Sequence, residues 1–372
     1  MRAFLLSFIL LSSVIVSCDM DRSNHRIPDR PVLNEDFYQA SLKSINTTID
    51  KNPDNPEAYF RKAQILKGLG KYNNAILTLE KAIKLKEKEV DYHMLLTELY
   101  SQNKEYAKAN AAALRAEQLG ENSAVFFARI AYINEISGSF DRALHYVNKA
   151  LMLAADDASL HLRKGMIALK SQDTTAAKSS LIRSLQYDTT WLEPYQLLTD
   201  IYIAEQKYDT AMVYLQKNLQ ANPTDPMLVW QEAAINKMRG NTEAAKNTYR
   251  KYIQLAGEGP EVLKNMADLF VETKQIDSAR LYAERWQQLV PKAVAPLLYL
   301  ARIDVSGRRY VSAKERYTAV LTLDSGNLAA SKELQELNQT LWKIERSRLP
   351  KRTEIEIVEP KEIKRLELPK KN

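Results

Sequence analysis

The sequence of 372 residues has one cysteine, Cys18, and only four histidines. A single cysteine excludes an intramolecular disulfide. None of the histidines is spaced from another as metal ligands are; they are His25, His93, His145 and His161. The chain also lacks a G-x-S-x-G nucleophile elbow and a phosphate-binding glycine loop. We therefore expect no enzyme active site, no metal and no cofactor.

Glycine and proline are scarce, with 10 and 13 residues, which is typical of a helical chain with short connections. Beyond the first 17 residues, no hydrophobic run reaches the roughly 20 residues that a membrane-spanning helix needs. Lys343–Asn372, with ten basic and six acidic residues, supplies +4 of the net charge of +7. The remaining chain is nearly neutral and has no basic stripe, so we expect no nucleic-acid binding. The mixed charge of the C-terminal segment favours solvation over contact with anionic lipid or cell-wall polymer.

Regularity is what the sequence does contain: Pro56–Asn327 divides into eight blocks of 34 residues without insertion or deletion. The blocks begin at Pro56, Val90, Ala124, Ala158, Leu192, Pro226, Pro260 and Val294. Their twentieth residue is always alanine: Ala75, Ala109, Ala143, Ala177, Ala211, Ala245, Ala279 and Ala313. Such a period predicts a solenoid of stacked units.

Each block contains two apolar stripes at helical spacing, separated by a turn signal. In the first block, Tyr59, Ala63 and Leu66 lie on one predicted helix, and Ala75 and Leu79 on the next. The eighth residue of every block is small, like the twentieth, so the two helices can approach closely. One helix pair cannot bury its apolar face alone, and neighbouring pairs therefore stack around a continuous core.

The turn between the two helices carries a family resemblance. Glycine occupies position 15 in three blocks, as Gly70, Gly138 and Gly240. An aromatic residue follows at position 17 in five blocks: Tyr72, Tyr106, Phe140, Tyr208 and Tyr310. With the 34-residue period, this pattern resembles the tetratricopeptide repeat (TPR) family. The resemblance implies an all-α, right-handed α-solenoid that binds proteins, without indicating which protein.

Some blocks depart from the pattern of the family. The turn aromatic is replaced by Thr174, Thr242 and Ile276. The small residue at position 27 is replaced by Asn218, Tyr252 and Trp286. The fourth, sixth and seventh repeats therefore match the family pattern less well, although all keep the alanine at position 20.

Residues 1–17 resemble a bacterial lipoprotein signal peptide, with Arg2 followed by 14 apolar or small residues. Ile15–Cys18 resembles a lipobox, which implies lipidation of Cys18; the alternative is an ordinary signal peptide with an incidental cysteine. The resemblance implies a diacylglyceryl thioether and an amide-linked acyl chain, and several acyl chains give stable anchoring. Residues 18–34 are predicted to be a flexible tether. Asp19 and Asp21 resemble an inner-membrane retention signal of some bacteria and a surface-export signal of others, and both interpretations stay open.

Flanking segments complete the array. Residues 35–55 are predicted to form an N-terminal capping helix, and residues 328–346 a C-terminal one with a polar outer face. The charged tail, residues 347–372, is predicted to be disordered, although Thr353–Val358 alternates like a short strand.

Positions 2, 5, 9 and 12 of each first helix fall on one stripe, which lines the concave groove in the geometry of the family. The stripe is charged or mixed toward the ends of the array and apolar in the middle, and such apolar patches often mark partner sites. The predicted groove residues are Val125, Tyr132, Leu162, Met166, Leu169, Ile203, Met227 and Trp230. The alternative is that tight superhelical curvature buries some of them between repeats.

These patterns predict a lipid-anchored scaffold of the gram-negative envelope, most simply at the outer membrane and facing the periplasm or the surface. It would bind an envelope protein or peptide in secretion, pilus assembly or cell-wall assembly. The alternative is a glycan-binding lipoprotein for nutrient uptake built on TPR helices. Long insertions form the sugar site in such proteins, and the eight uninterrupted blocks disfavour this alternative.

Overall fold

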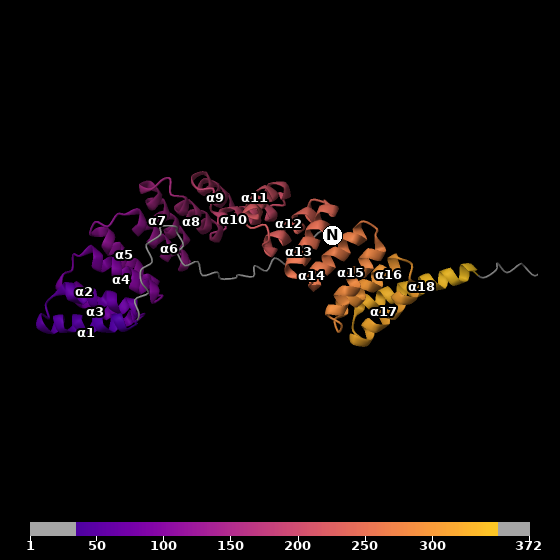
Figure 1. The fold of residues 1–372 in the computed structure, drawn as a ribbon, viewed down its shortest axis with the longest axis horizontal. Helices are drawn as coiled ribbons and strands as arrows, with labels where there is room; N and C mark the ends of the chain where they lie inside the picture. Colours follow the sequence, from indigo (N-terminus) through magenta and orange to yellow (C-terminus); the bar gives the residue numbers. More distant parts are fainter. Residues whose placement is uncertain (1–34, 349–372) are drawn as a thin grey trace, which may run out of the picture. The chain divides into compact units, whose positions relative to one another are not determined.

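The computed structural model describes residues 35–348, and every regular element among them is an α-helix (Figure 1). The first helices of the eight repeats are α2 (Pro56–Gly68), α4 (Val90–Gln102), α6 (Ala124–Ile136), α8 (Ala158–Lys170), α10 (Leu192–Ala204), α12 (Pro226–Met238), α14 (Pro260–Glu272) and α16 (Val294–Ser306). The second helices are α3 (Tyr72–Leu85), α5 (Tyr106–Gln118), α7 (Phe140–Leu153), α9 (Thr174–Tyr187), α11 (Tyr208–Ala221), α13 (Thr242–Ala256), α15 (Ile276–Leu289) and α17 (Tyr310–Leu323). Flanking helices are α1 (Glu35–Lys51) and α18 (Leu328–Arg348).

The fold class predicted from the sequence is confirmed, because every first helix begins at the first residue of a block. Side-chain caps mark several of these starts: Asn55, Ser123 and Asp225 each accept a backbone N–H of the first turn. The predicted signal peptide, Cys18 and the tether, all within residues 1–34, lie outside the described residues. So does the predicted tail from residue 349 onward, including Thr353–Val358.

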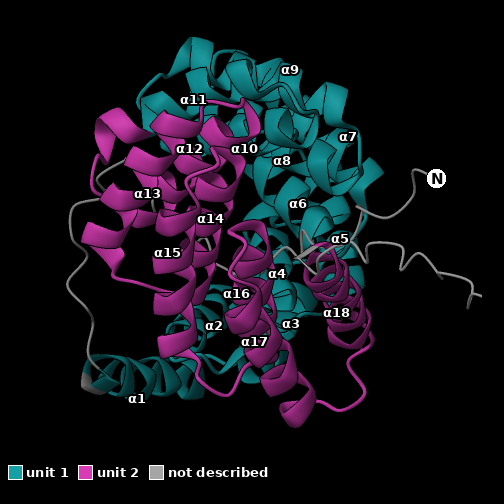
Figure 2. Ribbon diagram, turned by 90° about the vertical axis from the view of Figure 1, so that its right-hand side faces the viewer, with its two compact units in different colours: residues 1–218 teal, residues 219–372 magenta. Residues whose placement is uncertain are grey.

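The contacts of the chain form two compact units, residues 1–218 and residues 219–372, coloured separately in Figure 2. Each unit is a stack of helix pairs. In unit 1, α1 contacts α2, and Leu42 packs against the core of the first two repeats. In unit 2, α18 contacts α17, and Ala330 and Leu337 join the core of the eighth repeat.

The seam between the two helices of each repeat is packed as predicted. All eight alanines at position 20 are 0% exposed, and the alanines at position 8, such as Ala63 and Ala131, are equally buried. At Gly165, an added Cβ would lie only 2.8 Å from Cγ of Leu181. The small residues are therefore required by the close approach of the two helix backbones.

The two histidines at position 4 are packed residues. His93 and His161 are 6% and 5% exposed. Each Nε2 hydrogen-bonds, at 2.9 Å, the carbonyl oxygen of the residue six positions earlier, in Glu87 and Ala155 respectively. His161 also stacks on Tyr187. Both rings thus join the repeat core to the loop that precedes their helix.

The turn within each repeat places position 15 in the left-handed region, whether or not glycine stands there. The non-glycine residues at this position have φ between 58° and 65°: Lys104, Gln172, Gln206, Lys274 and Arg308. The next residue always donates its N–H to the carbonyl of position 11, as from Lys71 to Leu66 at 2.9 Å. This is the Schellman closure of a helix C-terminus, which glycine favours. Only three of these turns were recognisable from glycine in the sequence.

This geometry yields a stability prediction. Gln172 has φ 65° and is exposed, so Gln172→Gly should relieve backbone strain without removing a contact. We expect the free energy of unfolding to rise by about 0.5–1 kcal/mol in urea denaturation. The reverse change at Gly70, Gly70→Gln, should lower it by a similar amount. If Gln172→Gly is destabilising, the left-handed turn is not a source of strain.

Candidate functional site

The candidate site is the face formed by positions 2, 5, 9 and 12 of the first helices, called here the first-helix face. In unit 1 it is carried by α2, α4, α6, α8 and α10, and in unit 2 by α12, α14 and α16. Within each unit, side chains of neighbouring first helices contact one another across repeat boundaries, as Lys67 and Glu98 do in unit 1 and Lys237 and Asp268 in unit 2. These contacts decide which predicted groove residues are open to a partner.

Ion pairs cross the first-helix face of unit 1 from helix to helix. Glu98 of α4 lies 2.9 Å from Nζ of Lys67 in α2 and 3.3 Å from Nη1 of Arg129 in α6. The Glu98 side chain is 27% exposed, so solvent screens this pair only in part. One carboxylate thus links three consecutive repeats.

A second carboxylate on this face is almost fully buried. The Glu135 side chain of α6 is 2% exposed and pairs with two cations of α8, Arg163 at 2.9 Å and Lys170 at 2.6 Å. The Arg163 guanidinium also lies over the ring of Tyr132, 5.1 Å from its centroid. Since a buried charge is tolerated only with partners, this cluster fixes α6 against α8. It also holds Tyr132 on the face.

The apolar residues predicted for the groove differ in their exposure. In unit 1, Val125 is 73% exposed, while Tyr132, Met166, Leu169 and Ile203 are partly exposed. Met166 and Leu169 also pack against the core that contains Leu181 and Leu198. These five residues of the first-helix face are called here the apolar patch of unit 1.

The prediction is wrong for Leu162, which is 5% exposed and belongs to the core around Leu181 and Leu198. Leu162 stands at position 5 of α8. The core that it joins contains residues of α9 and α10, so Leu162 is buried where two repeats meet, as the alternative interpretation anticipated.

In unit 2, the two predicted residues have opposite environments. Met227 is 68% exposed. Trp230 is partly buried and packs against the core of the sixth and seventh repeats, with its ring centroid 5.3 Å from that of Tyr249 and 5.1 Å from that of Tyr252. Tyr252 stands at position 27 of this repeat, where the family has a small residue, and its ring contacts Trp230 at position 5. The prediction that Trp230 lines an open groove is therefore wrong, because its ring packs on the second helix of its own repeat.

Unit 2 repeats the ionic pattern of unit 1. Asp268 of α14 lies 3.6 Å from Nζ of Lys237 in α12 and accepts a short hydrogen bond from the Tyr299 hydroxyl of α16. Arg302 of α16 binds Glu333 of α18 through two parallel contacts, Nε–Oε2 at 2.9 Å and Nη2–Oε1 at 2.7 Å. The hydrogen bond from Arg302 lowers the pKa of Glu333 below its usual range. This pair therefore contributes at neutral pH and is lost as the pH falls through the lowered pKa.

Sequence reasoning missed these links, although a numerical signal for them exists. Lys67, Glu98 and Arg129 are separated by 31 residues each, and so are Lys237, Asp268 and Tyr299. A step of 31 residues is one repeat less three, and it leads from position 12 to position 9 and then to position 6 of successive first helices. Complementary polar residues at this spacing would have revealed the links.

Within residues 35–348, no group of three or more His, Cys, Asp or Glu side chains could hold a metal ion. No helix in that part of the chain combines the length and the apolar character needed to cross a bilayer.

Comparison with known proteins supports the fold. Residues 56–89 match the tetratricopeptide repeat family. Human protein O-mannosyl-transferase TMTC1 is 26% identical over 215 residues, which cover 57% of this chain and 24% of that protein. The rice DnaJ protein P58IPK homolog A is 25% identical over 217 residues, which cover 58% of this chain and 40% of that protein. The matched segment is thus less than half of either relative.

A solved structure extends the comparison. The C-terminal part of a TPR repeat-containing protein from Cytophaga hutchinsonii superposes with a TM-score of 0.56 at 18% identity, covering 66% of this chain and 99% of that one.

The Trp230 contacts lead to a prediction for unit 2. Trp230→Ala removes the aromatic packing on Tyr249 and Tyr252 and should lower the free energy of unfolding by about 2–3 kcal/mol. Met227→Ala, at a residue 68% exposed on the same helix, should change it by less than about 0.5 kcal/mol. Chemical denaturation of the two variants checks this. Equal effects would mean that Trp230 is not part of the core.

Taken together, the 34-residue period, the helix pairs of both units, the match at residues 56–89 and the Cytophaga structure establish that this chain has the α-solenoid fold of tetratricopeptide repeat proteins.

Proposed function

We propose that the protein is a lipid-anchored scaffold of the gram-negative bacterial envelope that binds another envelope protein through its first-helix face. The observation that carries the binding role is the apolar patch of unit 1. Val125 is 73% exposed there, and it lies in the same stripe as the partly exposed Tyr132, Met166 and Ile203. Apolar side chains gathered on one exposed face favour a protein partner.

The charges of the face support an apolar partner segment. Glu98 and Glu135 are each engaged by two cations of neighbouring helices, so these charges are already compensated within the protein. These two carboxylates therefore present no uncompensated charge to a partner that touches the patch. We infer that it binds by burying apolar side chains, among which Met166 offers an adaptable contact.

The lipid anchor is inferred from the sequence alone. Ile15–Cys18 has an aliphatic residue, a small residue before the cut and a thiol that can be alkylated. The proposed place is the outer membrane, facing the periplasm or the surface, and the proposed roles are secretion, pilus assembly or cell-wall assembly. A glycan-binding lipoprotein is the second candidate, although the unbroken 34-residue period offers no insertion for a sugar site.

The binding role is tested by two matched substitutions in unit 1. Val125→Glu places a charge in the apolar patch, and Val213→Glu makes the same change on the second-helix side, where valine is 60% exposed. Both should leave the melting temperature nearly unchanged, since the side chains are exposed. After the partner is identified by crosslinking in native envelope, Val125→Glu should weaken its Kd at least about tenfold, and Val213→Glu should not. If the partner binds the two variants with equal affinity, the apolar patch is not the binding site.

The anchor is tested by Cys18→Ala. Metabolic labelling with a fatty-acid analogue should label the wild-type protein and leave the variant unlabelled, because the variant has no thiol for the lipid. The variant should also leave the membrane fraction. Equal labelling of both proteins would remove the lipoprotein proposal while leaving the binding role intact.

A further inference from the structure

The last described helix, α18, stands where the first helix of a ninth repeat would. It begins at Leu328, one period of 34 residues after Val294, and packs on α17 as α16 packs on α15. In the complete repeats, position 8 is small and covered by the second helix of the same repeat. In α18, position 8 is Gln335, which is exposed, and no further helix follows within the described residues. Among residues 35–348, therefore, no helix covers the side of α18 that a second helix would cover.

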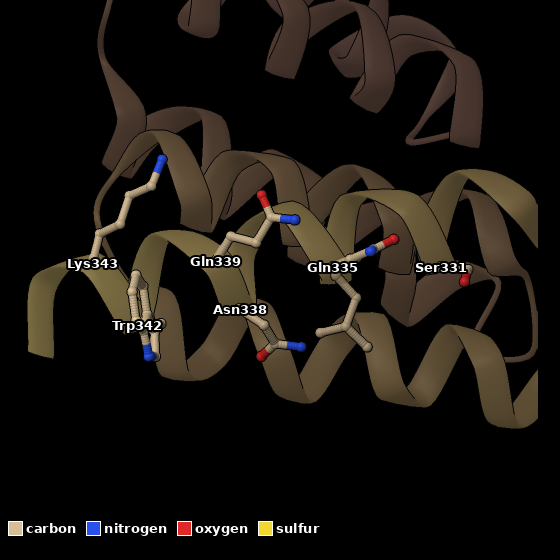
Figure 3. Close-up of a pocket in the computed structure, with 7 residues that line it drawn as sticks. Ser331, Gln335, Asn338, Gln339, Trp342 and Lys343 are labelled. Atoms are coloured by element: carbon tan, nitrogen blue, oxygen red, sulfur yellow. The ribbon is translucent and has the colours of Figure 1, made fainter. Parts of the chain in front are cut away.

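This side, called here the α18 face, forms a hollow of about 720 Å³ (Figure 3). The described residues that line it all come from α18: Ser331, Leu334, Gln335, Asn338, Gln339, Trp342 and Lys343. Trp342 is 56% exposed, and the Arg346 guanidinium lies 5.0 Å from its ring centroid. The helix runs for 21 residues, whereas the first helices of the complete repeats have 13. Trp342 consequently lies on the part that projects beyond the repeat layer.

Three side-chain amides line the middle of the α18 face, those of Gln335, Asn338 and Gln339. None of them hydrogen-bonds another described residue, and each offers both donors and an acceptor. A docked helix would satisfy its own backbone and would gain little from these amides. An extended segment brings unpaired backbone N–H and C=O groups, which need such partners when covered. The amides therefore favour an extended occupant.

The charges beside the α18 face distinguish two possible occupants, a second copy of this chain and an acidic segment. By helical spacing, Lys332, Lys343 and Arg346 fall along one flank of the face, and Lys332 has only a 4.0 Å contact with exposed Glu336. A second copy of α18, related by a two-fold axis, would bring these flanks together and place like charges side by side. An acidic segment is complementary to them.

The chain itself contains such a segment close to the helix. Residues 353–359 carry three glutamates, Glu354, Glu356 and Glu359, alternating with or next to Ile355, Ile357 and Val358, and contain no basic residue. The segment starts five residues after Arg348, a span of up to about 17 Å when extended. Because a helix rises about 1.5 Å per residue, the same distance covers about eleven residues of α18, so a chain that turns back at Arg348 can reach past Trp342. So short a tether also gives an effective concentration in the millimolar range.

We propose that Thr353–Glu359 folds back as an extended segment and docks on the α18 face, where it covers the side that no described helix covers. The isoleucine side chains contact Trp342 and Leu334, the glutamates face Lys343 and Arg346, and the amides of Gln335 and Asn338 bind the segment's backbone. The occupant is thus part of the same chain and is held by apolar, ionic and backbone contacts together.

Hydrogen–deuterium exchange of the full chain tests this, with a synthetic peptide of residues 349–372 as the unprotected reference. The backbone amides of residues 355–358 should exchange at least about tenfold slower in the chain than in the peptide. Trp342→Ala and the double variant Lys343→Glu/Arg346→Glu should each abolish this protection. All three changes are at exposed residues, so α18 itself stays folded.

Reversing the charges of the segment's glutamates supplies the specific control. Glu354→Lys/Glu356→Lys should remove the protection, and combining it with Lys343→Glu/Arg346→Glu should restore it. The matched change Glu362→Lys/Glu367→Lys, in the same tail but outside the segment, should have no effect. Exchange in residues 355–358 as fast as in the peptide would overturn the proposal. Protection that appears only as protein concentration rises would overturn it in favour of a second copy.

Discussion

The close crossing of two helices within each repeat is the constraint on which the rest of the structure depends. Alanine at position 20 has no exposed surface in any of the eight repeats, and Gly165 has no space for a Cβ beside Leu181. Because interiors are packed at crystal-like density, a larger side chain at either position would push the two backbones apart. The same short connection must then close every helix pair. This explains why position 15 adopts the left-handed conformation even where glutamine, lysine or arginine stands there.

Once the seams fix the backbone, the remaining contacts between repeats are made by whichever side chains the first helices present to one another. Glu98, Glu135 and Asp268 each take polar partners from an adjacent first helix. Glu135 is the most demanding of these, since its carboxylate is 2% exposed and loses nearly all hydration. Its two cations on α8 offset that loss. The links hold neighbouring repeats in register while the seams hold each repeat together.

The sequence predicted the backbone well and the side-chain environments less well, for one physical reason. The bounds of the helices and the buried seam follow from the period, because the same geometry recurs every 34 residues. The surroundings of Leu162 and Trp230 do not, because burial at position 5 depends on residues of other helices, such as Tyr252. The ionic links needed pairs of residues 31 apart, which no inspection of a single block reveals. Cys18 and the rest of residues 1–34 lie outside what the structure tests.

The two candidate surfaces differ in how their charges are used, and this suggests different kinds of occupant. On the first-helix face of unit 1, both carboxylates that link the helices are saturated by cations of the protein, so a bound partner gains mainly from covering apolar side chains. On the α18 face, Lys343 has no acidic partner among the described residues, and its neighbours include three amides without a hydrogen bond to that part of the chain. Free donors of this kind suit an acidic, extended segment, whose backbone and side chains both need partners. The first surface is therefore suited to a separate protein and the second to a segment tethered nearby.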